Sequence, residues 1–135
     1  MSQDAVEVAR RAFEAFNLAF AEGADDLYEV LDPDVEWIPV MAVLEGRTYR
    51  GTEEVRRWVA ELRQDWAAFE VKPEQFRDLG EGRVLALGSW RAQGRRGAVP
   101  LDFPQAGWLL QIRGERVTRL RAYTNRGEAL EAAGL

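Results

Sequence analysis

The sequence RVLALGSWRAQ at residues 83–93 is followed by VPLDFPQAGWLLQI at 99–112 and ERVTRLRAYT at 115–124. In each run, apolar side chains alternate with polar ones or form short groups, a pattern typical of strands with a buried face. Glycine-containing turns at Gly94–Gly97 and Arg113–Gly114 separate the runs. Because the connections are short, the sequence predicts an antiparallel meander rather than crossover units.

One further strand, 70–79, precedes the meander and is separated from it by the turn Gly80–Gly82. Upstream of residue 70 the apolar spacing becomes helical. A helix capped by Thr52 is predicted, with Trp58 flanking an apolar stripe formed by Val55, Val59, Leu62, Trp66 and Phe69.

The first helix is predicted between Asp4, as N-cap, and Gly23, with Phe13, Phe16 and Phe20 on one face. A short helix at 25–31, a strand at 35–39 and an irregular rim at 40–51 follow. Asn125 is placed to cap a last short helix that ends near Gly134.

This order of elements predicts one α+β domain over residues 1–135. A cone-shaped, curved antiparallel sheet packs on three helices, and the space that the helices leave unfilled forms an apolar pocket.

Composition excludes several kinds of chemistry. The chain has no cysteine and no histidine, so it offers no thiolate nucleophile, no imidazole base and no ordinary zinc site. We therefore expect no metal and no cofactor. The net charge of −5 argues against a nucleic-acid partner. No signal peptide and no segment of bilayer length is recognisable, so we expect no membrane partner and a cytoplasmic protein.

Four motifs together resemble the SnoaL-like branch of the nuclear-transport-factor-2-like (NTF2-like) superfamily. They are VEW at 35–37, GRTYRGTEEVRRW at 46–58, GRRGAVP at 94–100, and Tyr123 followed by EALEAAGL at 128–135. The resemblance covers nearly the whole chain and implies a conical fold, a homodimer formed through the sheet, and an apolar pocket inside the cone. Members include ketosteroid isomerases, polyketide cyclases, limonene epoxide hydrolases and proteins with no known activity, so fold alone leaves function open.

The positions that carry catalysis in those enzymes are filled differently here. Trp37 stands where the isomerases place their aspartate base, and Phe13 and Phe16 stand near the place of their tyrosine. Trp108 lies near the position of the second oxyanion donor. Ala122 replaces an acid of the epoxide hydrolases. The resemblance therefore implies that both catalytic arrangements are incomplete.

Asp102 is the acid that lies among apolar neighbours, and strand parity puts it on the predicted concave face with Ala106 and Trp108. Burial there would suit a general acid or base, so Asp102 and Tyr123 are the candidate catalytic residues. The alternative is a carboxylate at the start of a strand, at the mouth of the cone, hydrogen-bonded to the backbone or paired with Arg91 or Arg95.

Aromatic side chains on several elements are the candidate ligand-binding residues, because they give rigid contact area to flat apolar molecules. They are Trp37, Tyr49, Trp58, Trp90 and Trp108. Core packing or a dimer interface explains part of this set equally well.

The sequence thus favours a SnoaL-like protein that binds a compact hydrophobic or aromatic small molecule. One alternative is a cofactor-independent isomerase, cyclase or epoxide hydrolase that uses acid–base chemistry. Another is a non-catalytic interaction or dimerisation module.

Overall fold

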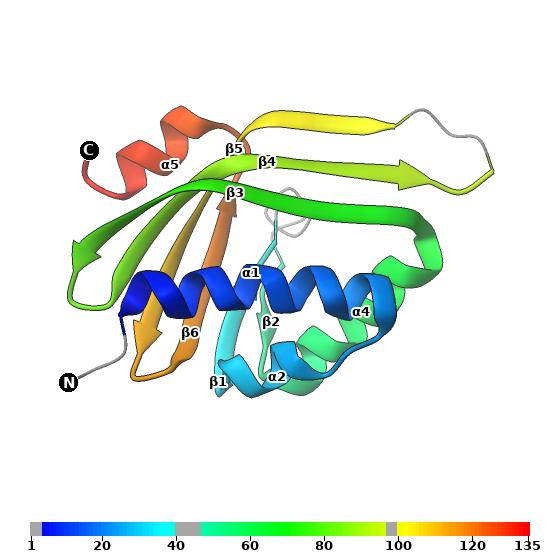
Figure 1. The fold of residues 1–135 in the computed structure, drawn as a ribbon, viewed down its shortest axis with the longest axis horizontal. Helices are drawn as coiled ribbons and strands as arrows, with labels where there is room; N and C mark the ends of the chain where they lie inside the picture. The colour runs from blue at the N-terminus through cyan, green and yellow to red at the C-terminus, as the bar shows by residue number, and fades with distance from the viewer. Residues whose placement is uncertain (1–3, 40–46, 97–99) are drawn as a thin grey trace.

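A computed structural model describes residues 4–39, 47–96 and 100–135. The elements follow one another as shown in Figure 1. They are α1 (Ala5–Glu22), α2 (Asp26–Val30), β1 (Leu31–Ile38), β2 (Tyr49–Arg50), α4 (Thr52–Asp65), β3 (Trp66–Gly80), β4 (Arg83–Gly94), β5 (Leu101–Arg113), β6 (Arg116–Tyr123) and α5 (Arg126–Ala132).

The strands form a curved sheet in the order β2-β1-β6-β5-β4-β3. The meander predicted from the sequence is confirmed, since β3, β4, β5 and β6 pair antiparallel in succession. The sheet as a whole is mixed, because β1 runs parallel to β6. The long segment between these two strands, which includes α4 and the four strands β2, β3, β4 and β5, supplies the crossover that a parallel pair needs.

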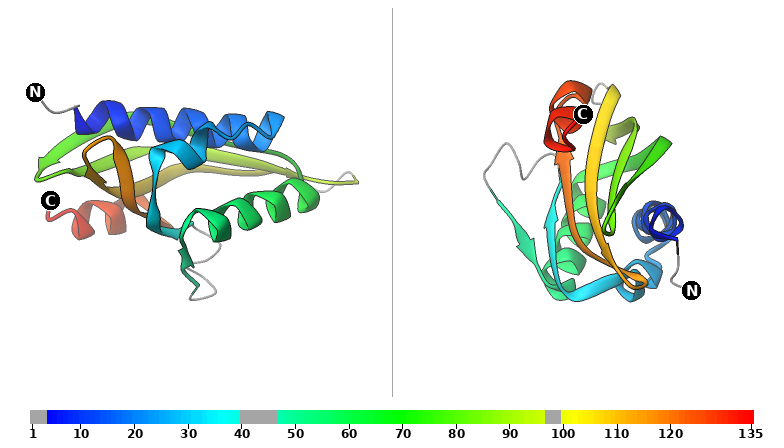
Figure 2. Two further views of the ribbon diagram at one scale, coloured as in Figure 1. Left: turned by 90° about the horizontal axis from the view of Figure 1, so that it is seen from below. Right: turned by 90° about the vertical axis from the view of Figure 1, so that its left-hand side faces the viewer.

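The two faces of the sheet bury different clusters of apolar side chains. On β4, Val84 and Ala86 belong to the main core, which α1, α2 and α4 cover. Leu85 and Leu87 point the other way and pack with Ala129 of α5 in a smaller cluster. The α+β prediction is therefore confirmed, with α5 added on the opposite face (Figure 2).

The helix ends that the sequence predicts from local signals are confirmed at three positions. The Asp4 side chain accepts a hydrogen bond from the backbone N–H of Val6, and the Asn125 side chain accepts one from Glu128. Gly23 ends α1 in the left-handed conformation, at φ 71°.

The predicted boundary after α4 is wrong. The helix ends at Asp65, and Trp66 already pairs with Gly94 as the first residue of β3. Phe69 therefore lies on a strand although its spacing fits the helical stripe. Pairing with β4 outweighs the helical pattern here, which is how tertiary contacts commonly override local preference. At the other end, Gly51 rather than Thr52 is the N-cap residue.

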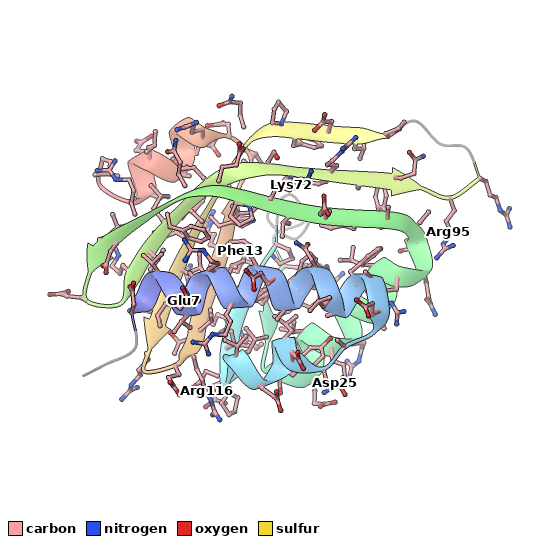
Figure 3. The ribbon with its side chains drawn as sticks, in the orientation of Figure 1. Glu7, Phe13, Asp25, Lys72, Arg95 and Arg116 are labelled. Atoms are coloured by element: carbon pink, nitrogen blue, oxygen red, sulfur yellow. The ribbon has the colours of Figure 1, made fainter. Side chains whose placement is uncertain are left out.

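Side chains tie the helices to the sheet. Arg95, beyond the end of β4, donates hydrogen bonds to the carbonyl oxygens of Gln64 and Arg63 at the end of α4 (Figure 3). Charged side chains such as Glu7, Asp25 and Lys72 lie on the outside. In the part of the chain that the structure describes, no helix is both long and apolar enough to cross a membrane.

Candidate functional site

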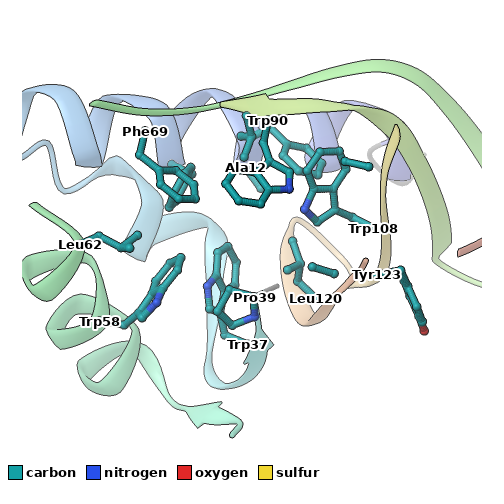
Figure 4. A pocket seen from close by; sticks show the side chains of 15 residues that line it. Ala12, Trp37, Pro39, Trp58, Leu62, Phe69, Trp90, Trp108, Leu120 and Tyr123 are labelled. Carbon is teal, nitrogen blue, oxygen red and sulfur yellow. The ribbon is translucent and has the colours of Figure 1, made fainter. Parts of the chain in front are cut away.

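A small cavity lies between the inner face of the sheet and the helices α1 and α4. Its volume is about 40 Å³, and Figure 4 shows side chains of the 15 residues that line it. Most of the wall is aromatic, and the largest contributions come from Phe13, Phe16, Trp37, Trp58, Trp90 and Trp108.

Strand pairing explains why these side chains face one another. Trp37 of β1 pairs with Leu120 of β6, and both line the cavity. Trp108 of β5 pairs with Ala122 of β6, again with both on the wall. Directly opposed residues project to the same face of a sheet, so each pair adds one large and one smaller side chain to the inner surface.

Ring contacts hold the aromatic wall together. Phe16 lies at its centre, with its ring centroid 5.7 Å from that of Trp58, 5.9 Å from that of Phe69 and 6.5 Å from that of Trp37. Trp90 is stacked on two rings, at 5.3 Å from Phe69 and 4.2 Å from Phe103. Such contacts add to the energy of area burial and fix the ring orientations.

The polar groups of the wall are chiefly indole N–H groups. None of the described lining residues carries a charge at neutral pH. The Trp37 side chain is 4% exposed, and its Nε1 is buried without a hydrogen-bond acceptor among the described residues. The wall can therefore enclose an apolar body and donate hydrogen bonds, but it offers no carboxylate or amine for proton transfer.

Four of the five predicted ligand-binding residues line the cavity, namely Trp37, Trp58, Trp90 and Trp108. Tyr49 does not. It pairs with Trp37 across β1 and β2, and its ring centroid lies 6.0 Å from that of Trp58. That these residues bind a ligand stays a prediction.

The prediction that Asp102 lies on the inner face with Ala106 is wrong. Gly88 pairs with Ala106, whereas Trp90 pairs with Phe103, so β5 has one residue more than β4 in this interval. This β-bulge reverses the alternation, which puts Phe103 on the inner face with Trp90 and turns Asp102 outward. Asp102 is exposed at the start of β5, where Arg91 is its partner in the strand register, and the ion pair of the alternative interpretation stays a prediction.

Tyr123, the second candidate catalytic residue, borders the cavity but its hydroxyl points away from the other lining side chains (Figure 4). The residue before it, Ala122, occupies the inward position. The Tyr123 ring packs with the α5 cluster, and the Arg121 guanidinium lies 5.1 Å from its centre. The described structure thus does not bring Asp102 and Tyr123 together in the cavity.

The sequence predicts the inward direction of Ala106, on the face of Trp108, but it does not mark Ala12 or Ala122 as residues of the wall. Nor does it place Phe69 there. The inward direction of Ala122 could have been read from its alternation with Leu120, whereas the bulge that brings in Phe103 depends on pairing between strands.

Neither a protein-family model nor a curated protein matches this chain. Solved structures do match it over almost its whole length. An NTF2-like protein of unknown function from Burkholderia pseudomallei has a TM-score of 0.71 and 21% identity, over 98% of this chain and 99% of that one. A protein with a ketosteroid isomerase-like fold from Catenulispora acidiphila, solved in complex with trimethylamine, has a TM-score of 0.71 and 20% identity, over 100% and 95%.

A third match is described as a SnoaL-like polyketide cyclase, from Shewanella denitrificans. Its TM-score is 0.71 and its identity 15%, over 95% of this chain and 97% of that one. At such identities the agreement concerns architecture, and a shared architecture supports many activities. The chain therefore has the fold of the NTF2-like and SnoaL-like proteins.

Proposed function

We propose that this protein binds a compact, uncharged hydrophobic or aromatic molecule in the cavity between its sheet and helices. The observation that supports this most directly is the wall itself, in which four tryptophans from β1, α4, β4 and β5 converge. An aromatic wall with few polar groups is the usual lining of a small-molecule site.

The present volume limits what can enter without movement. About 40 Å³ is well below the roughly 150 Å³ of an engineered apolar cavity that binds benzene. An aromatic ligand therefore has to displace lining side chains. The Catenulispora protein, solved with trimethylamine, is a case of the same fold with a very compact guest.

Binding is favoured over acid–base catalysis because of what the wall contains. Asp102 is exposed, and the Tyr123 hydroxyl points away from the cavity. We expect Asp102→Asn to leave ligand affinity unchanged, which isothermal titration calorimetry can measure. A loss of affinity in this variant would mean that the carboxylate takes part in the site.

Thermal unfolding with and without ligand tests the proposal. A ligand at 100 times its Kd stabilises the folded state by about 2.7 kcal/mol, a rise in Tm of roughly 5 to 10 °C. Probes are acetophenone and ethylbenzene, which are both uncharged. Ala122→Val adds two methyl groups to the wall opposite Trp108 and should abolish the rise.

Ala67→Val is the matched control, since Ala67 is exposed on the same sheet. It should keep the full rise in Tm. If Ala122→Val does not fold, Ala106→Val fills the same cavity from β5. An equal rise in the filled variants, or no rise with any probe, would contradict binding in this cavity.

The small volume of the cavity, about 40 Å³, favours a second candidate function, a non-catalytic interaction or dimerisation module. If no probe raises Tm, the tryptophans form a packed core, and the outer face of the sheet would be the surface that contacts a protein partner.

A homodimer and a cytoplasmic location are further expectations of this proposal. Size-exclusion chromatography with light scattering measures the former directly.

A further inference from the structure

The cavity has an unusual balance of hydrogen-bonding groups. Four of the five tryptophans of the chain line it, and an indole nitrogen can donate a hydrogen bond but cannot accept one. The other described lining side chains are apolar except for the Tyr123 phenol, so among them hydrogen-bond donors outnumber acceptors.

Trp37 is the extreme case. Its Nε1 is fully buried, its side chain is 4% exposed, and no described residue accepts its proton. Leaving a buried donor without a partner costs stability, and the great majority of buried polar groups in folded proteins are satisfied. A donor left unpaired in the wall of a cavity indicates that its partner comes with the guest.

The arrangement of the neighbouring rings gives such a guest access to Trp37. The Trp37 and Trp58 rings have centroids 6.0 Å apart and are inclined by 57°, so they are not stacked on each other. A guest that separates these rings reaches the edge of Trp37. Figure 4 shows both side chains at the same end of the cavity, below Phe69 and Leu62.

The absence of charged side chains from the described lining favours an uncharged ligand. An anion or cation buried here would lose its hydration without gaining a counter-ion from the described lining, which is costly. A neutral molecule with a hydrogen-bond acceptor has no such cost. The face of an aromatic ring attracts cations, but an N–H edge repels them.

Resting on the proposed function, we propose that the ligand is a neutral compound with an oxygen acceptor, such as a ketone or ester carbonyl, held by the N–H of Trp37. Trp37 is then the residue that determines specificity. A purely hydrocarbon guest would fill the cavity but leave this donor unpaired.

The test compares two ligands of nearly equal shape in three proteins. Acetophenone carries a carbonyl where ethylbenzene carries a methylene group, and their dissociation constants are measured by calorimetry in the wild type, Trp37→Phe and Trp66→Phe. Trp37→Phe removes the donor and keeps an aromatic ring. Trp66 lies outside the cavity wall, so Trp66→Phe is the matched control.

We expect Trp37→Phe to weaken acetophenone roughly three- to tenfold more than it weakens ethylbenzene, the range of one neutral hydrogen bond. Trp66→Phe should change both ligands equally. Equal weakening of both ligands by Trp37→Phe would overturn the assignment of the donor while leaving pocket binding intact. Failure of both ligands to bind the wild type would instead contradict the proposed function.

A measurement on the wild type covers the case in which Trp37→Phe does not fold. In a ¹⁵N–¹H correlation spectrum, acetophenone should move the Trp37 indole proton downfield more than ethylbenzene does, because a new acceptor deshields it. The same shift with both ligands would contradict the hydrogen bond.

Discussion

The Asn17 side chain of α1 makes the two backbone hydrogen bonds with Val71 of β3 that a neighbouring strand would otherwise make. Its side-chain amide donates a hydrogen bond to the carbonyl oxygen of Val71 at 2.9 Å and accepts one from the Val71 N–H at 3.0 Å. Since β3 is an edge strand, these bonds satisfy two backbone groups that would otherwise face water. They also fix the distance between α1 and the part of β3 that lines the cavity.

Replacing Asn17 by alanine should lower the free energy of unfolding by roughly 1 to 3 kcal/mol, because two hydrogen bonds are lost. Urea denaturation measures this. Asn17→Asp keeps only the acceptor and should lie between the wild type and the alanine variant. A value for Asn17→Ala within 0.5 kcal/mol of the wild type, roughly the range of ordinary surface substitutions, would show that this link contributes little.

Tyr28 gives a prediction about pH. Burial raises the pKa of its phenol above the usual 10.0, and the Arg56 guanidinium, 4.0 Å from the ring centre, lowers it in part. A raised pKa means that the folded state favours the neutral phenol. This contribution is complete below pH 10 and is lost as pH rises through the pKa of the folded state.

The free energy of unfolding should therefore fall more steeply between about pH 9 and 11 in the wild type than in Tyr28→Phe. Denaturation curves at a series of pH values give both slopes. Parallel slopes would contradict the assigned shift.

At the scale of elements, Gly107 sets how closely α5 approaches the sheet. A Cβ atom at this position would collide with the Cβ of Ala129. Gly107→Ala should therefore push α5 away from β5 and cost roughly 1 to 3 kcal/mol, as overpacking usually does.

Gly127→Ala, within α5 itself, is the matched control. The nearest atom to its added Cβ is the Asn125 Oδ1, at an ordinary 3.4 Å. Since alanine favours helix by about 1 kcal/mol over glycine, this variant should be as stable as the wild type or more so. Urea denaturation of the two variants should thus give changes of opposite sign, and equal losses would contradict the close packing of Gly107 on α5.

Among the helices and strands, the features that depend on local contacts could be predicted from the sequence. Asp4, Gly23 and Asn125 mark helix ends through contacts within a few residues, so their roles follow from sequence alone. The outward turn of Asp102 depends on a bulge in the pairing of β5 with β4, which no local pattern contains. The helix boundary at Asp65 was missed for the same reason, because the apolar spacing continues into β3.

At the scale of the whole molecule, the pocket results from the curvature of the sheet and the size of the side chains placed inside it. The four tryptophans could be predicted to line the pocket because they lie on several elements that converge in this fold and offer rigid aromatic contact area. The narrowness of the cavity, about 40 Å³, could not be predicted, since it depends on how Phe16, Phe69 and Trp90 pack together.

The central claim is that this aromatic wall receives a neutral guest. The five tryptophans allow a direct measurement, because each gives one indole signal in a ¹⁵N–¹H correlation spectrum, assigned by single Trp→Phe variants. During titration with acetophenone, the signals of Trp37, Trp58, Trp90 and Trp108 should shift and reach saturation, while that of Trp66 stays in place. Signals that do not move, or a shift of Trp66 alone, would contradict the account.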